Sequence, residues 1–150
     1  MHAAVARLRT REECEEFARV TQHRDPELAA QARRRAVELR AALHRAQNVA
    51  EQEALKAIYA YEEVLSVKRG RRTPASRTWQ MVKRRGIIGA VERAVNRTTD
   101  ASGYTALAEI GMLDLSFEAV VLRHPDSFSA NALARAKERL AGWSGAEHAS

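Results

Sequence analysis

The sequence contains few residues of the kinds that cross-link, stiffen or anchor a small protein. It has a single cysteine, Cys14, which excludes an intrachain disulfide and a zinc site built from four cysteines. Only three prolines are present, and 5% of the residues are aromatic. No apolar run approaches the ~20 residues of a membrane-spanning helix, and the first residues lack the apolar stretch of a signal peptide. We therefore expect a cytoplasmic protein with no membrane partner.

Acidic residues are nearly missing from one part of the chain. Between positions 68 and 97 the only acid is Glu92, while ten Lys or Arg residues give this window a formal charge of +9. Because the whole chain carries +6, the other residues sum to −3. The ten cations are Lys68, Arg69, Arg71, Arg72, Arg77, Lys83, Arg84, Arg85, Arg93 and Arg97. Clustered charge of one sign repels itself and is relieved by a polyanion, so nucleic acid is the first partner we expect.

The composition favours helices, because Ala, Leu, Arg and Glu are frequent. No segment of four to eight residues alternates strictly between apolar and polar side chains, so strands are not required. We predict an all-α protein of seven to eight short helices, packed as one compact orthogonal bundle that includes an N-terminal helical hairpin. Residues 1–9 are expected to be flexible, and residues 144–150 are expected to form a frayed tail.

Residues 10–46 are predicted to form the hairpin. Thr10 matches the first residue of a capping box, in which a hydroxyl and a carboxylate satisfy free backbone amides at a helix start. The first helix should continue to about residue 22. Asp25 followed by Pro26 is typical of another helix start, and this second helix should continue to about residue 45.

Residues 48–143 are predicted to form a helical nucleic-acid-binding domain. Asn48 should open its first helix, and Gly70 should end that helix in a left-handed conformation. The polar stretch 98–103 is the best candidate for a loop. The helices are expected over 49–69, from Pro74 to Gly86, and over 87–97, 104–110, 113–123 and 130–143.

The segment 73–97 is predicted to be a basic, helix-turn-helix-like pair of short helices joined at Gly86. At 100° per residue, the first of these helices has a polar face, and Trp79 lies on the opposite side as an anchor. The second helix is mostly apolar, so we expect the first to contact nucleic acid, although the second does so in many helix-turn-helix proteins. The polar face consists of Arg77, Gln80, Lys83 and Arg84.

Nine residues are candidates for binding nucleic acid, and we expect double-stranded DNA rather than RNA. Arg69, Arg71, Arg72 and Lys83 should neutralise phosphates. Arg77, Gln80 and Arg84 should face base edges, since Arg bonds guanine bidentately and Gln bonds adenine. Thr73 and Ser76 should contact a phosphate at the helix N-terminus. If the second helix packs beside the fourth, then Arg33, Arg34 and Arg40 would extend the positive surface.

Two other functions stay open. A protein-interaction module (an inhibitor, adaptor or accessory subunit) would dock an acidic protein partner through the same basic face. A metal-dependent nuclease would use Asp114 and Glu118, which are four residues apart on one face of an expected helix. The histidines and carboxylates lack the spacing of zinc or di-iron sites, and there is no Gly-rich phosphate loop. We therefore expect a non-catalytic protein with no cofactor, no metal and no catalytic residue.

Two stretches carry a resemblance to a known kind of domain. They are IYAYEEVLSVKRGRRTPASRTWQMVKRRGIIGAVERAVNR and GYTALAEIGMLDLSFEAVVLRHPDSFS, within residues 57–129. This part, about half of the chain, resembles a bacterial helical module found in small proteins and beside restriction-type nuclease domains. The resemblance implies a DNA-handling or DNA-defence setting, and it assigns no catalytic residue.

Overall fold

The computed structural model describes residues 1–148, and the prediction of an all-α protein is confirmed for them. They form eight α-helices, two short 3-10 turns and no strand. Within this part of the chain no helix is both long enough and apolar enough to cross a membrane. The elements are α1 (Ala3–Ala6), α2 (Arg11–Thr21), α3 (Pro26–Ala42), α4 (Val49–Arg69), α5 (Ser76–Asn96), α6 (Ser102–Glu109), η1 (Leu113–Leu115), α7 (Phe117–Arg123), η2 (Pro125–Ser127) and α8 (Ala130–His148).

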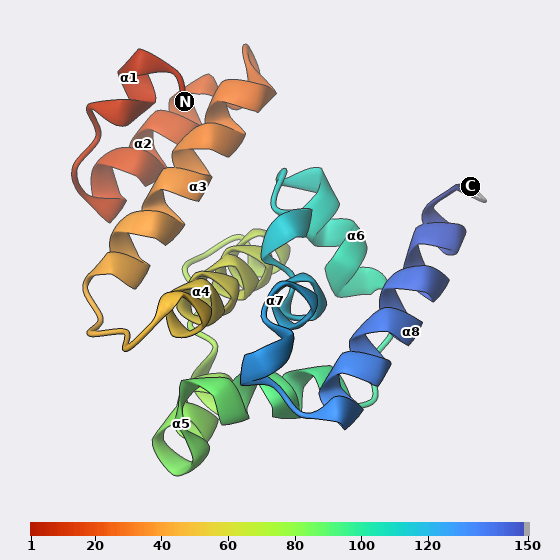
Figure 1. Ribbon diagram of the computed structural model, residues 1–150. Coiled ribbons are helices and arrows are strands. Elements are labelled where there is room, and N and C mark those ends of the chain that lie inside the picture. The colour runs from red at the N-terminus through yellow and green to blue at the C-terminus, as the bar shows by residue number, and fades with distance from the viewer. Residues whose placement is uncertain (149–150) are drawn as a thin grey trace.

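The N-terminal helical hairpin forms as predicted. The hydroxyl of Thr10 accepts a hydrogen bond from the amide of Glu13 and opens α2. The carboxylate of Asp25 accepts one from the amide of Leu28 and opens α3. The two helices pack along each other, as Figure 1 shows. Local capping thus determines where both helices begin.

The first residues differ from the predicted flexible N-terminus over 1–9. Ala3–Ala6 form the short helix α1, in which the amide of Ala4 donates to the imidazole of His2. Val5 is completely buried and packs with Ala29 and Ala32 of α3. A four-residue helix is too short to show a hydrophobic period, so burial against the hairpin decides this element.

Helix α4 lies at the centre of the molecule and contacts α3, α5, α6 and α7 (Figure 1). Asn48 caps its first turn, and Gly70 ends it at a φ of 69°, as predicted from the sequence. One apolar cluster joins Ala54 and Ala57 of α4 to α5, α7 and α8. A second cluster joins Ala60 and Val64 to the region of α6 and η1. Both sides of α4 are therefore buried.

Gly86 divides α5 into two limbs, 76–85 and 87–96, at the predicted position. Its φ of 81° and ψ of 175° lie in a region that only glycine occupies readily. The first limb begins at Ser76, later than the predicted start at Pro74. The reason is that the amide of Ala75 donates to the buried carboxylate of Glu62, which holds the preceding residues outside the helix. One residue separates the limbs, whereas a helix-turn-helix has a turn of 3–4 residues.

The C-terminal helices differ from the predicted boundaries in two places. The helix expected over 113–123 is divided, because Ser116 has extended dihedral angles and caps α7 through its hydroxyl. Helix α8 follows Ser129 as predicted but continues to His148. The predicted frayed tail over 144–150 is therefore helical up to residue 148, and residues 149 and 150 lie outside the described residues.

The unusual backbone of Gly86 gives a test of the divided α5. We expect Gly86→Ala to lower the free energy of unfolding by about 1–3 kcal/mol, because a Cβ is strained in this conformation. Gly142→Ala on α8 is the control, since nothing lies within 4 Å of the added Cβ. That change should stabilise the protein by roughly 0.5–1 kcal/mol. Urea denaturation followed by circular dichroism measures both, and a stabilised Gly86→Ala variant would show that α5 runs straight through.

Candidate nucleic-acid interface

All ten cations between positions 68 and 97 are exposed to solvent. Only Arg72 among them forms an ion pair within the part of the chain that the structure describes. Its guanidinium lies 2.9 Å from Glu15 and 3.8 Å from Glu12, both on α2. The charges of the other nine are thus left without a partner carboxylate, in contrast to Arg11, Arg34 and Arg123 elsewhere in the chain.

The first limb of α5 has the two faces that its sequence predicts. Trp79 is turned toward the protein, where its indole N–H donates to Glu62 Oε2 at 2.7 Å. The side chains on the opposite side are exposed. These exposed side chains are Arg77, Gln80, Lys83 and Arg84. The half-buried Trp79 thus lies on the inner side of the limb, and the cationic, amide-bearing face is exposed.

Thr73 and Ser76 lie differently from the expected pair at a helix N-terminus. Thr73 precedes the helix, and its hydroxyl donates to the carbonyl of Arg71. Its amide donates to the hydroxyl of Ser66, so both of its polar groups stabilise the loop. Ser76 is exposed in the first turn of α5, and Ala75 is the capping residue. Of the two hydroxyls, only that of Ser76 lies at the helix start.

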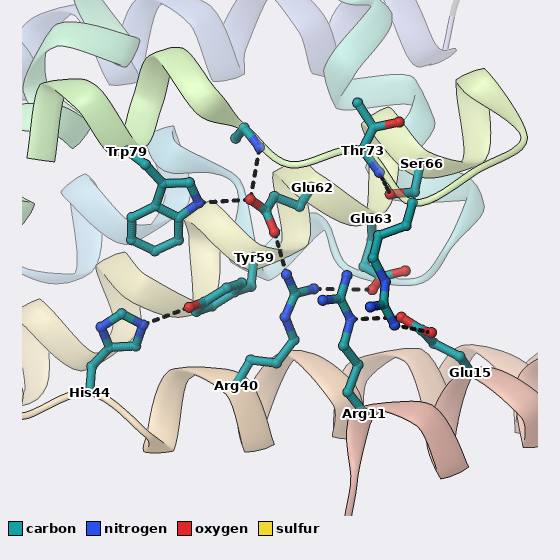
Figure 2. Close-up of polar contacts among 12 residues, drawn as sticks. Arg11, Glu15, Arg40, His44, Tyr59, Glu62, Glu63, Ser66, Thr73 and Trp79 are labelled. Carbon is teal, nitrogen blue, oxygen red and sulfur yellow. Dashed lines mark hydrogen bonds and ion pairs between the residues drawn. The ribbon is translucent and has the colours of Figure 1, made fainter.

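The cations among the nine candidate residues occupy two places along α4. After Gly70 the chain turns back along α4, because Thr73 contacts Ser66 and Ala75 contacts Glu62 (Figure 2). Arg69 and Arg71 therefore lie at the C-terminal end of α4, while the first limb of α5 begins beside the middle of that helix. A ligand that contacts both groups must follow the length of this loop.

The carboxylate of Glu62 is the point where three segments meet, and Figure 2 shows its partners. Its Oε2 accepts hydrogen bonds from the amide of Ala75 and from Trp79 Nε1, both at 2.7 Å. Its Oε1 is paired with Arg40 of α3. Glu62 is only 3% exposed, and a buried charge is tolerated when it is paired and hydrogen-bonded. This one side chain joins the hairpin, α4 and the basic limb.

Aromatic side chains cover this ion pair. Tyr59 lies beneath the guanidinium of Arg40, which is 4.2 Å from its ring centroid. Trp79 stacks parallel to His44, with their ring centroids 5.6 Å apart. The predictions from the sequence did not include this group. Its signal was Glu62 itself, which follows Ile58 by four residues on the apolar stripe of α4.

The next residue, Glu63, is also buried but is poorly paired. Its carboxylate lies 3.7 Å from Arg40, too far for a hydrogen bond. Burial raises the pKa of Glu63 above its ordinary value. The neighbouring Arg40 Nη1 has no hydrogen-bond partner among the described residues. Glu62 and Glu63 are thus adjacent buried carboxylates, of which the first is fully hydrogen-bonded and the second is not.

The hypothesis that Arg33, Arg34 and Arg40 extend the positive surface is wrong. Arg33 bonds the side chain of Gln22, and Arg34 makes a bidentate contact with Asp114 at 2.5 and 3.0 Å. Arg40 is buried against Glu62. These cations stabilise contacts between helices and are already neutralised or turned inward.

Asp114 and Glu118 do not share one helix face as expected. Asp114 belongs to η1 and is bound by Arg34, whereas Glu118 belongs to α7 and is buried with Arg139 at 3.2 Å. Over the described residues, no three His, Cys, Asp or Glu side chains are arranged to hold a metal ion. Each carboxylate of the proposed nuclease pair therefore has an arginine partner of its own.

Comparison with family models, curated proteins and solved structures gave no match to this chain. The resemblance of residues 57–129 to a bacterial helical module therefore stays a prediction.

The contrast between Glu62 and Glu63 can be tested by removing each charge. We expect Glu62→Gln to lower the free energy of unfolding by about 3–5 kcal/mol, because it leaves the buried guanidinium of Arg40 without its partner. Glu63→Gln is the matched control and should be neutral or stabilising at neutral pH. Urea denaturation of the two variants beside the unchanged chain measures the difference.

The pH dependence of the Glu63→Gln effect on stability follows from the raised pKa of Glu63. The folded state binds the proton more tightly than the unfolded state, so the contribution of this group is present in acid and is lost as the pH rises through the raised pKa. Any advantage of Glu63→Gln should therefore shrink as the pH falls below that pKa. Equal destabilisation by both variants would contradict the assignment of Glu62 as the essential anchor.

Proposed function

We propose that this protein is a non-catalytic nucleic-acid-binding protein whose ligand is double-stranded DNA. One observation carries the proposal: nine exposed cations between positions 68 and 97 have no carboxylate partner anywhere in the described chain. A bound polyanion places a phosphate beside each cation and so relieves their mutual repulsion. The counterions that surrounded the phosphates are released. The charge is carried on a helix and a structured loop, so it forms a surface of defined shape.

The proposed contacts divide by chemistry. Cations that lie beside the strand neutralise phosphates and carry no sequence information. Side chains on the exposed face of the first limb reach base edges in a groove. Phosphate contacts are assigned to Arg69, Arg71 and Lys83, with Ser76 at the helix start; base contacts are assigned to Arg77, Gln80 and Arg84. Arg72 contributes less than expected from the sequence, because Glu15 and Glu12 already balance its charge.

The proposed setting is DNA defence or regulation in the cytoplasm, and the resemblance to a bacterial helical module supports the defence part of it. The alternative is a protein-interaction module that docks an acidic partner through the same cations. The unpaired cations would suit either nucleic acid or an acidic protein. The two ligands are distinguished by the salt dependence of binding and by what co-purifies with the protein. The nuclease hypothesis is not proposed, because arginines occupy both of its carboxylates.

Salt dependence is the direct test of phosphate contacts. With about 6–10 such contacts, affinity for a short DNA duplex should fall by about 10³–10⁵ between 50 and 200 mM salt. Fluorescence anisotropy with duplex DNA, single-stranded DNA and RNA measures the slopes and ranks the three ligands. A shallow slope on every ligand would contradict the proposal. Recovery of an acidic protein after nuclease treatment would favour the alternative.

Charge removal on the first limb tests where the DNA binds. We expect Lys83→Gln with Arg84→Gln to weaken duplex binding by about 1–3 kcal/mol and to make it less dependent on salt. The control carries the same loss of charge in Arg24→Gln with Arg45→Gln, because both residues are exposed and lie outside the basic window. The same anisotropy titration measures both. Equal losses would show that net charge matters and that this limb has no special role.

A further inference from the structure

A groove of about 110 Å³ lies between the two limbs of α5. The first limb contributes Arg77 to its wall, and the second limb contributes Arg93 and Arg97. Small and apolar side chains form the rest of its lining: Thr78, Met81, Ala90 and Ala94. Two of these arginines, Arg93 and Arg97, were not among the residues expected to bind nucleic acid. The groove exists because Gly86 turns the second limb away from the axis of the first.

Each limb is held by a buried ion pair at the end away from the kink. The first limb is fixed at its start, where Ala75 and Trp79 donate to Glu62. The second limb is fixed at its C-terminus, where the guanidinium of Arg139 donates to the carbonyls of Ala94 and Arg97. Arg139 is itself paired with buried Glu118. Both walls are therefore positioned before any ligand arrives, which lowers the entropic cost of binding.

The charge of the groove is not balanced from within the protein. In residues 1–144, where side chains are described, no carboxylate lies within 4.0 Å of the three guanidinium groups. The one acid of the basic window, Glu92, accepts a hydrogen bond from the amide of Ser129 at the start of α8. The planar guanidinium matches the oxygens of a phosphate and bonds two of them at once. The small side chains of Ala90 and Ala94 leave room for such a group.

We propose that this groove holds a backbone phosphate of the bound nucleic acid, clamped between Arg77 of one limb and Arg93 and Arg97 of the other. Arg77 then contacts this phosphate in place of a base edge, and base contacts are left to Gln80 and Arg84. This inference rests on the proposed function and adds a defined phosphate site to it. The bound strand then crosses the kink and contacts both limbs. Arg97 holds the phosphate through its side chain alone, because its backbone N–H already donates to the carbonyl of Arg93.

The first test compares two charge-matched double variants of the full chain. Arg93→Gln with Arg97→Gln should reduce the slope of affinity against salt by about one for each phosphate that the variant no longer binds. Arg24→Gln with Arg45→Gln should leave that slope near its original value. If both double variants change it equally while the unchanged chain binds duplex DNA, the groove inference fails and the proposed function stands. If the unchanged chain binds no nucleic acid, both fail.

The second test reports occupancy of the groove through an introduced thiol, and the burial of the single native cysteine makes this possible. Cys14 is fully buried, and burial raises the pKa of its thiol to about 11, so it reacts slowly at neutral pH. Thr78→Cys places a thiol in the groove, and Thr105→Cys places one on an exposed position of α6 as the control. Saturating duplex DNA should slow alkylation of the first thiol by neutral iodoacetamide and leave the second unchanged.

Two results of this labelling would overturn the inference. One is an unchanged alkylation rate at Thr78→Cys under conditions where DNA is bound. The other is equal protection by sodium phosphate at the same total phosphate concentration as the DNA, which would assign the groove to free phosphate. Circular dichroism of both cysteine variants checks that they are folded.

Discussion

The buried carboxylate of Glu62 is the interaction on which the arrangement of the basic surface depends. It lies in the middle of α4, where a charge is costly unless it is fully paired. Arg40 of α3 supplies the opposite charge, and the start of α5 supplies two N–H groups. The hairpin and the basic limb are both docked on α4 through this one group, so its chemistry sets their relative positions.

The same kind of contact recurs at the other end of α5. There, the Arg139–Glu118 pair is buried, and the arginine satisfies carbonyls that the helix end leaves free. Arg34, Arg40 and Arg139 thus connect helices, while the cations of α5, and those of its preceding loop apart from Arg72, have no carboxylate partner among the described residues. The cations therefore fall into two groups: those that are paired with carboxylates of the protein, and those that are exposed without such a partner.

Much of the fold was predictable because it is determined by residues close in sequence. Asn48, Asp25 and Ser129 mark helix starts through side-chain oxygens that bond the backbone three residues on. Gly70 and Gly86 mark the positions where φ becomes positive. Such signals act within a few residues, so they can be recognised in the sequence without knowledge of the packing. The split at Ser116 carried the same signal, but the apolar pattern around it favoured one continuous helix.

The sequence alone was enough to predict the helical class, most helix boundaries and the outward face of the first limb. Capping and the helical period depend only on residues that are close in sequence. Packing decided the rest. Arg34 binds an aspartate 80 residues away, and Arg72 binds a glutamate 57 residues away. The same side chain in the same local pattern is neutralised in one case and free in another. Which cations remain for a ligand depends on long-range partners, and only the folded chain brings those partners together.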